Sequence, residues 1–153
     1  MNSNLFATNR VLIPIDFSEA SLQAQELTLD FVKDPSHLYV LHVIPPLNPG
    51  EPGVIWNRLD DETRKQHVYQ LFKQRFSRSE YEQVHFSVAV GDPVAAIVNY
   101  AKEQRIDLII VPSHKRTGLS HFFQGSVAEK VIRLAHCPVL VLGRDSLSAS
   151  SKQ

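Results

Sequence analysis

The chain has 153 residues, of which 43% are apolar and 21% are charged, as is ordinary for a soluble globular protein. Sixteen basic residues balance sixteen acidic ones, so no overall field favours nucleic acid or an anionic membrane as a partner. No apolar run approaches the ~20 residues that cross a bilayer, and the first residues lack the order of a signal peptide. The single Cys137 excludes an intrachain disulfide. We therefore expect a cytoplasmic protein.

The first part of the chain predicts a strand, a helix and a second strand. Residues 10–15 form an apolar run that ends at Asp16. Ser18 is suited to cap the following helix, whose expected inner face consists of Ala20, Ala24, Leu27 and Phe31. Residues 37–43 form the second apolar run and the second predicted strand.

The middle of the chain begins with a proline-rich segment at residues 45–53, which predicts a loop. A polar helix is expected over residues 60–76, with an inner face of Val68, Leu71, Phe72 and Phe76. Residues 84–90 alternate like a half-buried strand. Asp92 then caps a helix that starts at Pro93 and whose apolar face is Val94, Ile97, Val98 and Ala101.

The last part contains the most continuously apolar run, residues 106–111, which predicts the fourth strand. A fourth helix is expected to start near Ser126, with Val127, Val131 and Leu134 among its apolar residues. Residues 138–142 predict a fifth strand. We expect an N-terminal extension at 1–9, one domain at 10–143 and a flexible tail at 144–153.

Apolar strands that alternate with helices indicate an α/β fold: a doubly wound, Rossmann-like parallel sheet of five strands with helices on both faces. In such sheets, ligands bind outside the carboxyl ends of the strands, where the direction of the connections reverses. Asp16 follows the first strand, and Ser113 to Arg116 follow the fourth. If these strands are neighbours, one crevice holds both segments. Alternatively, Asp16 only organises the turn into the first helix, and its position in the sequence does not decide between the two.

The start of the fourth helix also has two compatible interpretations. Ser126 and Glu129 form a Ser-x-x-Glu capping box, which satisfies backbone donors at a helix start. The same start is an anion site, since free N–H groups and the helix dipole point there, and Gly125 permits close approach. Capping alone explains these residue types, so a phosphate site needs further support.

No residue set in the sequence predicts a metal centre or a catalytic centre. His114 and His121 share a loop but lack a nearby Cys, Asp or Glu that would complete a metal shell. The sequence contains neither a nucleophile elbow nor a Walker phosphate loop. Cys137 precedes a proline and an apolar strand, which favours a packed side chain over a nucleophile. We expect no metal site and no catalytic residues, and an enzymatic activity stays an open but less favoured interpretation.

Several ordered motifs resemble the universal stress protein family over roughly residues 9 to 143. They are VLIPIDFS from Val11, GDP from Gly91, IDLIIV from Ile106, HKRTGL from His114, GSVAE from Gly125 and HCPVLV from His136. The resemblance implies the sheet order 3-2-1-4-5, which makes the first and fourth strands neighbours. It also implies a homodimer that pairs the last strand across a two-fold axis, here Pro138, Val139, Leu140, Val141 and Leu142.

The nucleotide-binding branch of this family carries the motif Gly-x2-Gly-x9-Gly-Ser/Thr. On this chain the motif falls at Pro112, Lys115, Gly125 and Ser126, of which only the last two match. Pro112 removes a backbone donor and fixes φ. Lys115 keeps its N–H and adds a cation, at a penalty of roughly 1 kcal/mol if the loop requires positive φ. A lysine–phosphate contact could offset that penalty.

The resemblance thus implies a stress-response protein that binds ATP or AMP, with Mg only in company of the nucleotide. The implied nucleotide-binding residues are Pro14, Ile15, Asp16, Val43, Pro112, Ser113, His114, Lys115, Arg116, Gly125, Ser126 and Val127. A second interpretation is a stress protein of the branch that does not bind nucleotides and acts through contacts with an unidentified protein. A weak ATPase is the third.

Overall fold

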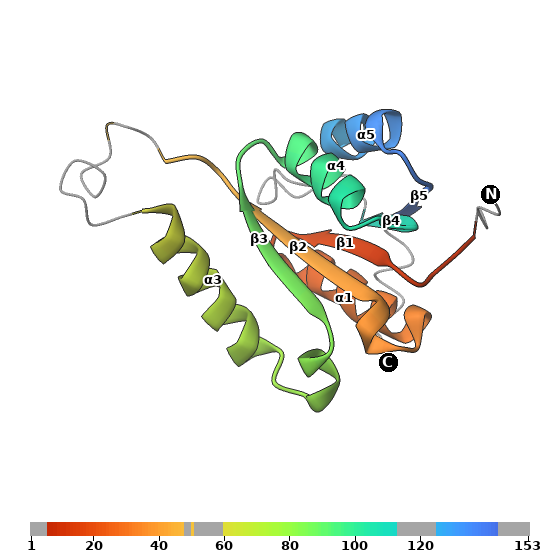
Figure 1. The fold of residues 1–153 in the computed structure, drawn as a ribbon, viewed down its shortest axis with the longest axis horizontal. Helices are drawn as coiled ribbons and strands as arrows, with labels where there is room; N and C mark the ends of the chain where they lie inside the picture. Colours follow the sequence, from red (N-terminus) through yellow and green to blue (C-terminus); the bar gives the residue numbers. More distant parts are fainter. Residues whose placement is uncertain (1–5, 48–49, 51–59, 113–124, 144–153) are drawn as a thin grey trace.

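The computed structural model describes residues 6–47, 50, 60–112 and 125–143, the first two of the last range by their backbone alone (Figure 1). In these ranges five strands alternate with four α-helices. The strands are β1 (Val11–Ile15), β2 (Leu38–Ile44), β3 (His85–Val90), β4 (Leu108–Pro112) and β5 (Val139–Leu142). The helices are α1 (Glu19–Val32), α3 (Asp61–Arg75), α4 (Pro93–Glu103) and α5 (Gly125–Leu134). Two 3-10 turns add η1 (Pro35–His37) and η2 (Ser79–Glu82).

All neighbouring strands run parallel in the order β3-β2-β1-β4-β5. The predicted α/β class and the strand order that the resemblance implied are both confirmed. β1 is central, flanked by β2 on one side and by β4 on the other. β3 and β5 form the two edges of the sheet.

Each face of the sheet has its own apolar core, as a doubly wound fold requires. On one face, Leu12, Leu41 and Ile109 pack against residues of α4 and α5. On the opposite face, Val11 and Ile13 pack against α1 and against the end of α3. Figure 1 shows α4 and α5 on one side of the strands and α1 on the other. Alternate residues of β1 therefore face opposite cores, so the strand reads as continuously apolar.

Two predicted helix starts are confirmed. The Ser18 hydroxyl accepts a hydrogen bond from the backbone N–H of Ser21 at 3.3 Å. Asp92 accepts one from the N–H of Ala95 at 3.0 Å, and Pro93 occupies the first turn of α4. The predicted inner face of α4 is also confirmed, because all four of its apolar residues are buried.

The predicted inner face of α1 is wrong at its end, because Phe31 is 50% exposed. The buried face is rotated toward Ser21, Gln25 and Thr28, which are polar and almost fully buried. Each of the three makes a side-chain hydrogen bond inside the protein; the Thr28 hydroxyl, for example, donates to the carbonyl of Ala24 at 2.7 Å. A pattern of apolar residues alone does not reveal a face of this kind.

The inner face of α3 is smaller than predicted. Phe72 is its only buried residue, whereas Leu71 is 43% exposed. The Phe72 ring stacks on that of Phe86 with centroids 3.9 Å apart, which attaches the helix to the edge strand β3. Leu134, predicted among the apolar residues of α5, is 57% exposed. Among the described residues, no helix is both long and apolar enough to span a membrane.

Candidate functional site

The connections reverse direction between β1 and β4. The chain leaves β1 for α1 on one face of the sheet, and it leaves β4 for α5 on the opposite face. This arrangement is the switch point at which open α/β sheets bind ligands, at the carboxyl ends of the strands. β1 and β4 are therefore neighbours, as the candidate crevice requires.

Backbone pairing between β1 and β4 is limited to the amino-terminal half of the strands. Two residue pairs are in register, Val11 with Leu108 and Leu12 with Ile109. Beyond them come Pro14 and Pro112, and neither has an N–H to donate. Pro14 lies within a central strand and pairs in register with β2 only. Pro112 is buried and is the last residue of β4. The sequence predicted that this strand ends one residue earlier, at Val111.

Asp16 organises the turn from β1 into α1. Its carboxylate accepts a hydrogen bond from the N–H of Ser18 at 2.9 Å, and its own N–H donates to the hydroxyl of Ser21 at 3.3 Å. Phe17 between them has φ of 62°, in the left-handed region that a phenylalanine rarely adopts. Asp16 thus organises this turn, which does not by itself decide whether it also binds a ligand. Because the side chain is only partly buried, a second role as a ligand acceptor remains compatible with this turn.

His42 is a residue of this region that the sequence reasoning placed within a strand and did not assign to the site. It lies in register with Ile15, and its Nδ1 donates to the Ile15 carbonyl at 2.8 Å. Since a carbonyl only accepts, Nδ1 carries the proton. Burial lowers the pKa of His42, while the Ile15 carbonyl and the Asp16 charge oppose that shift. The Phe17 ring meets the imidazole edge-on at 4.9 Å.

The other predicted site residues are placed as follows. The side chains of Ile15 and Val43 are buried in opposite cores, so only their backbones are available to a ligand. Val127 is partly buried against the α4–α5 core. Ser113, His114, Lys115 and Arg116 lie outside the described residues, as does the side chain of Ser126 from the predicted capping box. The described part of the predicted site therefore consists of the β1 side of the crevice and the backbone of the first residues of α5.

Among the described residues, no group of three His, Cys, Asp or Glu side chains is placed to hold a metal ion. Cys137 packs against the α4–α5 core, and burial raises the pKa of its thiol to about 11. A thiol of this kind is a poor nucleophile at neutral pH. This agrees with the prediction that Cys137 is a packed side chain.

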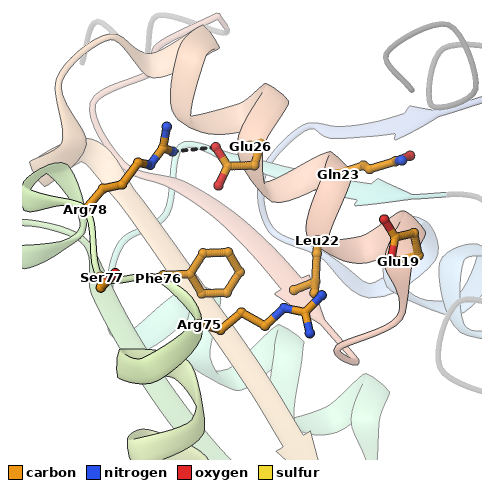
Figure 2. A pocket seen from close by; sticks show the side chains of 8 residues that line it. All are labelled: Glu19, Leu22, Gln23, Glu26, Arg75, Phe76, Ser77 and Arg78. Carbon is orange, nitrogen blue, oxygen red and sulfur yellow. Dashed lines mark hydrogen bonds and ion pairs between the residues drawn. The ribbon is translucent and has the colours of Figure 1, made fainter. Parts of the chain in front are cut away.

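Two hollows between α1, α3 and β3 have no counterpart in the sequence analysis. One, of about 290 Å³, lies between α1 and the end of α3. Figure 2 shows Arg75 and Phe76 reaching toward Leu22, while Arg78 bonds Glu26 of α1. The other, of about 470 Å³, lies between α3, η2 and β3, and shares Phe76, Ser77 and Arg78 with the first. None of their lining residues belongs to the predicted nucleotide site.

Comparison with known proteins gives a consistent result. The model of the universal stress protein family matches residues 7–143. Universal stress protein MJ0531 of Methanocaldococcus jannaschii is 31% identical over 138 residues, which cover 87% of this chain and 81% of that protein. The solved structure of MJ0577 from the same organism has a TM-score of 0.64 at 28% identity and covers 90% of this chain and 98% of that one.

A universal stress protein solved in complex with cAMP is similar to this chain in fold, with a TM-score of 0.55 at 19% identity, covering 89% of this chain and 98% of that one. The family match spans nearly all of the described sheet and its helices. The chain belongs to the universal stress protein family.

Proposed function

We propose that this protein is a stress-response regulator that binds an adenine nucleotide, ATP or AMP, in the crevice at the carboxyl ends of β1 and β4. The observation that carries the proposal is the switch point between these strands, where backbone pairing stops after Leu12 and Ile109. A family member that binds cAMP supports it, because cAMP is itself an adenine nucleotide.

In the proposed complex, the end of β1 binds the base or ribose of the nucleotide, and the end of β4 binds its phosphates. Asp16, next to Pro14 and Ile15, accepts hydrogen bonds from the base or ribose, together with the backbone at Val43. Residues 112–116 and the start of α5 at 125–127 hold the phosphates, because a helix start offers free N–H groups and a favourable dipole. Mg²⁺ enters only with the nucleotide.

A thermal melt with and without millimolar ATP or AMP tests this proposal. A ligand present at 100 times its dissociation constant adds about 2.7 kcal/mol of stability. Gly125→Val is expected to remove the shift by blocking close approach at the α5 start. Gly143→Val is the matched control, because a side chain at Gly143 meets nothing within 4 Å. The absence of a shift with ATP, ADP and AMP would contradict nucleotide binding.

A second candidate function, action through protein contacts without a nucleotide, is favoured by exposed apolar residues on α5 and β5. Ile132, Leu134, Leu140 and Val141 are 38–57% exposed. We propose that this edge also forms a homodimer, in which β5 (residues 138–142) pairs with its copy across a two-fold axis and covers its free backbone groups.

Light scattering during gel filtration tests the dimer. Leu140→Lys is expected to yield monomers, and Phe31→Lys is the control because Phe31 is a comparably exposed apolar residue on α1. A wild-type chain that is monomeric at micromolar concentration contradicts the proposal. The less favoured ATPase activity is excluded if phosphate release is no faster than in the double variant Lys115→Ala, Ser126→Ala.

A further inference from the structure

The cavity between α3, η2 and β3 is walled by aromatic rings. Phe72 stacks on Phe86 at 3.9 Å, and Tyr69 meets Phe86 edge-on at 5.4 Å. Phe76 and Tyr81 lie with centroids 4.8 Å apart. These five residues line the cavity, whose volume of about 470 Å³ lies in the usual range for small-molecule sites.

The walls are not fully covered by the protein itself. Phe72 and Tyr81 are buried, but Tyr69, Phe76 and Phe86 are only partly buried. Aromatic faces that remain open to water in a concave site favour a flat ligand, since stacking adds to the gain from burial. Phe76 lines this cavity and also the smaller one beside α1, where Figure 2 shows its ring.

The charged residues that line the cavity favour an anionic ligand over a cationic one. Lys73 and Arg78 oppose one carboxylate, Glu82. Arg78 is engaged on the α1 side, where its guanidinium bonds Glu26 at 2.5 Å and lies over the Tyr81 ring. The Lys73 ammonium forms neither an ion pair nor a hydrogen bond with any residue in the described part of the chain. An ammonium at the rim of an aromatic cavity suits an acidic group on a ring and disfavours a cation.

We propose that this cavity binds a planar aromatic anion, with the ring against Phe76, Tyr69 and Phe86 and the acidic group at Lys73. The site is separate from the crevice at β1 and β4 and does not depend on nucleotide binding. A cationic ligand would gain from the aromatic faces too. However, Lys73, which is unpaired within the described part of the chain, would repel it, so the two classes of ligand can be distinguished by experiment.

Titration calorimetry of the full chain with 2-naphthoate tests the proposal, with 2-naphthylmethylammonium as the cation of matched shape. The anion is expected to bind more tightly. Tyr69→Ala is expected to weaken both ligands, because it removes a wall and leaves the charges unchanged. Lys73→Glu is expected to weaken the anion alone, about five- to tenfold. Lys65→Glu is the matched control, with the same charge change on the same helix outside the cavity lining.

Four results overturn the proposal: no binding of naphthoate, equal or tighter binding of the cation, unchanged naphthoate affinity in Lys73→Glu, or displacement of naphthoate by ATP. The last result would assign the probe to the β1–β4 crevice. The melting temperature of each variant is measured first. A loss of affinity is counted only in a variant whose melting temperature matches that of the wild type. Wild-type-like melting of Lys73→Glu with weaker naphthoate binding and intact cation binding supports the proposal.

Discussion

Replacing Tyr81 by phenylalanine removes one oxygen from the junction between α1 and η2. That hydroxyl accepts a hydrogen bond from Gln25 Nε2 at 3.0 Å and donates one to Glu26 at 2.6 Å. Gln25 is fully buried and its Oε1 has no partner among the described residues, so the bond from its Nε2 to Tyr81 is the one side-chain hydrogen bond that its amide makes there. Glu26 is 43% exposed and regains its bond from water. The cost is therefore the buried, unsatisfied amide, about 1–3 kcal/mol.

Urea unfolding followed by circular dichroism measures this cost as a lower midpoint with an unchanged slope. The double variant Gln25→Leu, Tyr81→Phe is expected to recover most of the loss, because replacing both partners by apolar groups is nearly neutral. Tyr69→Phe is the control, since its hydroxyl has no bond within the described part of the chain. If Tyr81→Phe costs less than about 0.5 kcal/mol, or the double variant is no more stable than the single one, the buried-amide explanation is wrong.

Asp92→Ala removes the N-cap bond to Ala95 and is expected to lower the unfolding free energy by about 1 kcal/mol, measured by urea unfolding. Burial raises the pKa of Cys137 to about 11, so its alkylation by iodoacetamide at pH 8 is expected to be about a hundredfold slower in the native protein than in urea. Equal rates would contradict its burial. The pKa of His42 is lowered from 6.5 by burial, so the unfolded chain binds more protons in acid. The contribution of neutral His42 to the free energy of unfolding is therefore present above pH 6.5 and is lost as the pH falls below it. His42→Gln should reduce that loss, measured in thermal melts between pH 7 and pH 5. Burial and the bond to Glu26 raise the pKa of Tyr81, so stability should fall as the pH rises above 10, less steeply in Tyr81→Phe.

The sequence predicted best the elements whose stability is local and apolar. α4 is such an element: its cap, its first proline and its buried face all follow from neighbouring residues. The sheet order could not be derived from pattern alone, because parallel strands pair through contacts between distant residues, and it came from the family resemblance. That order is what places the β1 and β4 ends side by side.

The errors arise where burial depends on a distant partner. Gln25 reads as a surface residue of α1, but Tyr81, 56 residues away, bonds its amide and makes its burial possible. Likewise, α3 contributes mainly Phe72 to the core, so its other apolar residues did not predict its inner face. His42 was hidden by its position in a strand, since only the register with Ile15 reveals what its ring contacts.

The limited pairing between β1 and β4 also bears on how the sheet moves. At their amino ends the strands are joined firmly, with the Arg10 carbonyl accepting from the N–H of Asp107 at 2.8 Å and the Arg10 N–H donating to its carboxylate. Toward Pro14 and Pro112 no register pair continues this connection. The three strands β3, β2 and β1 and the two strands β4 and β5 are thus joined by register pairs at one end only. We expect fluctuations that part these two units to grow toward the carboxyl ends of β1 and β4, and a molecule that contacts both ends to suppress them and slow amide exchange there.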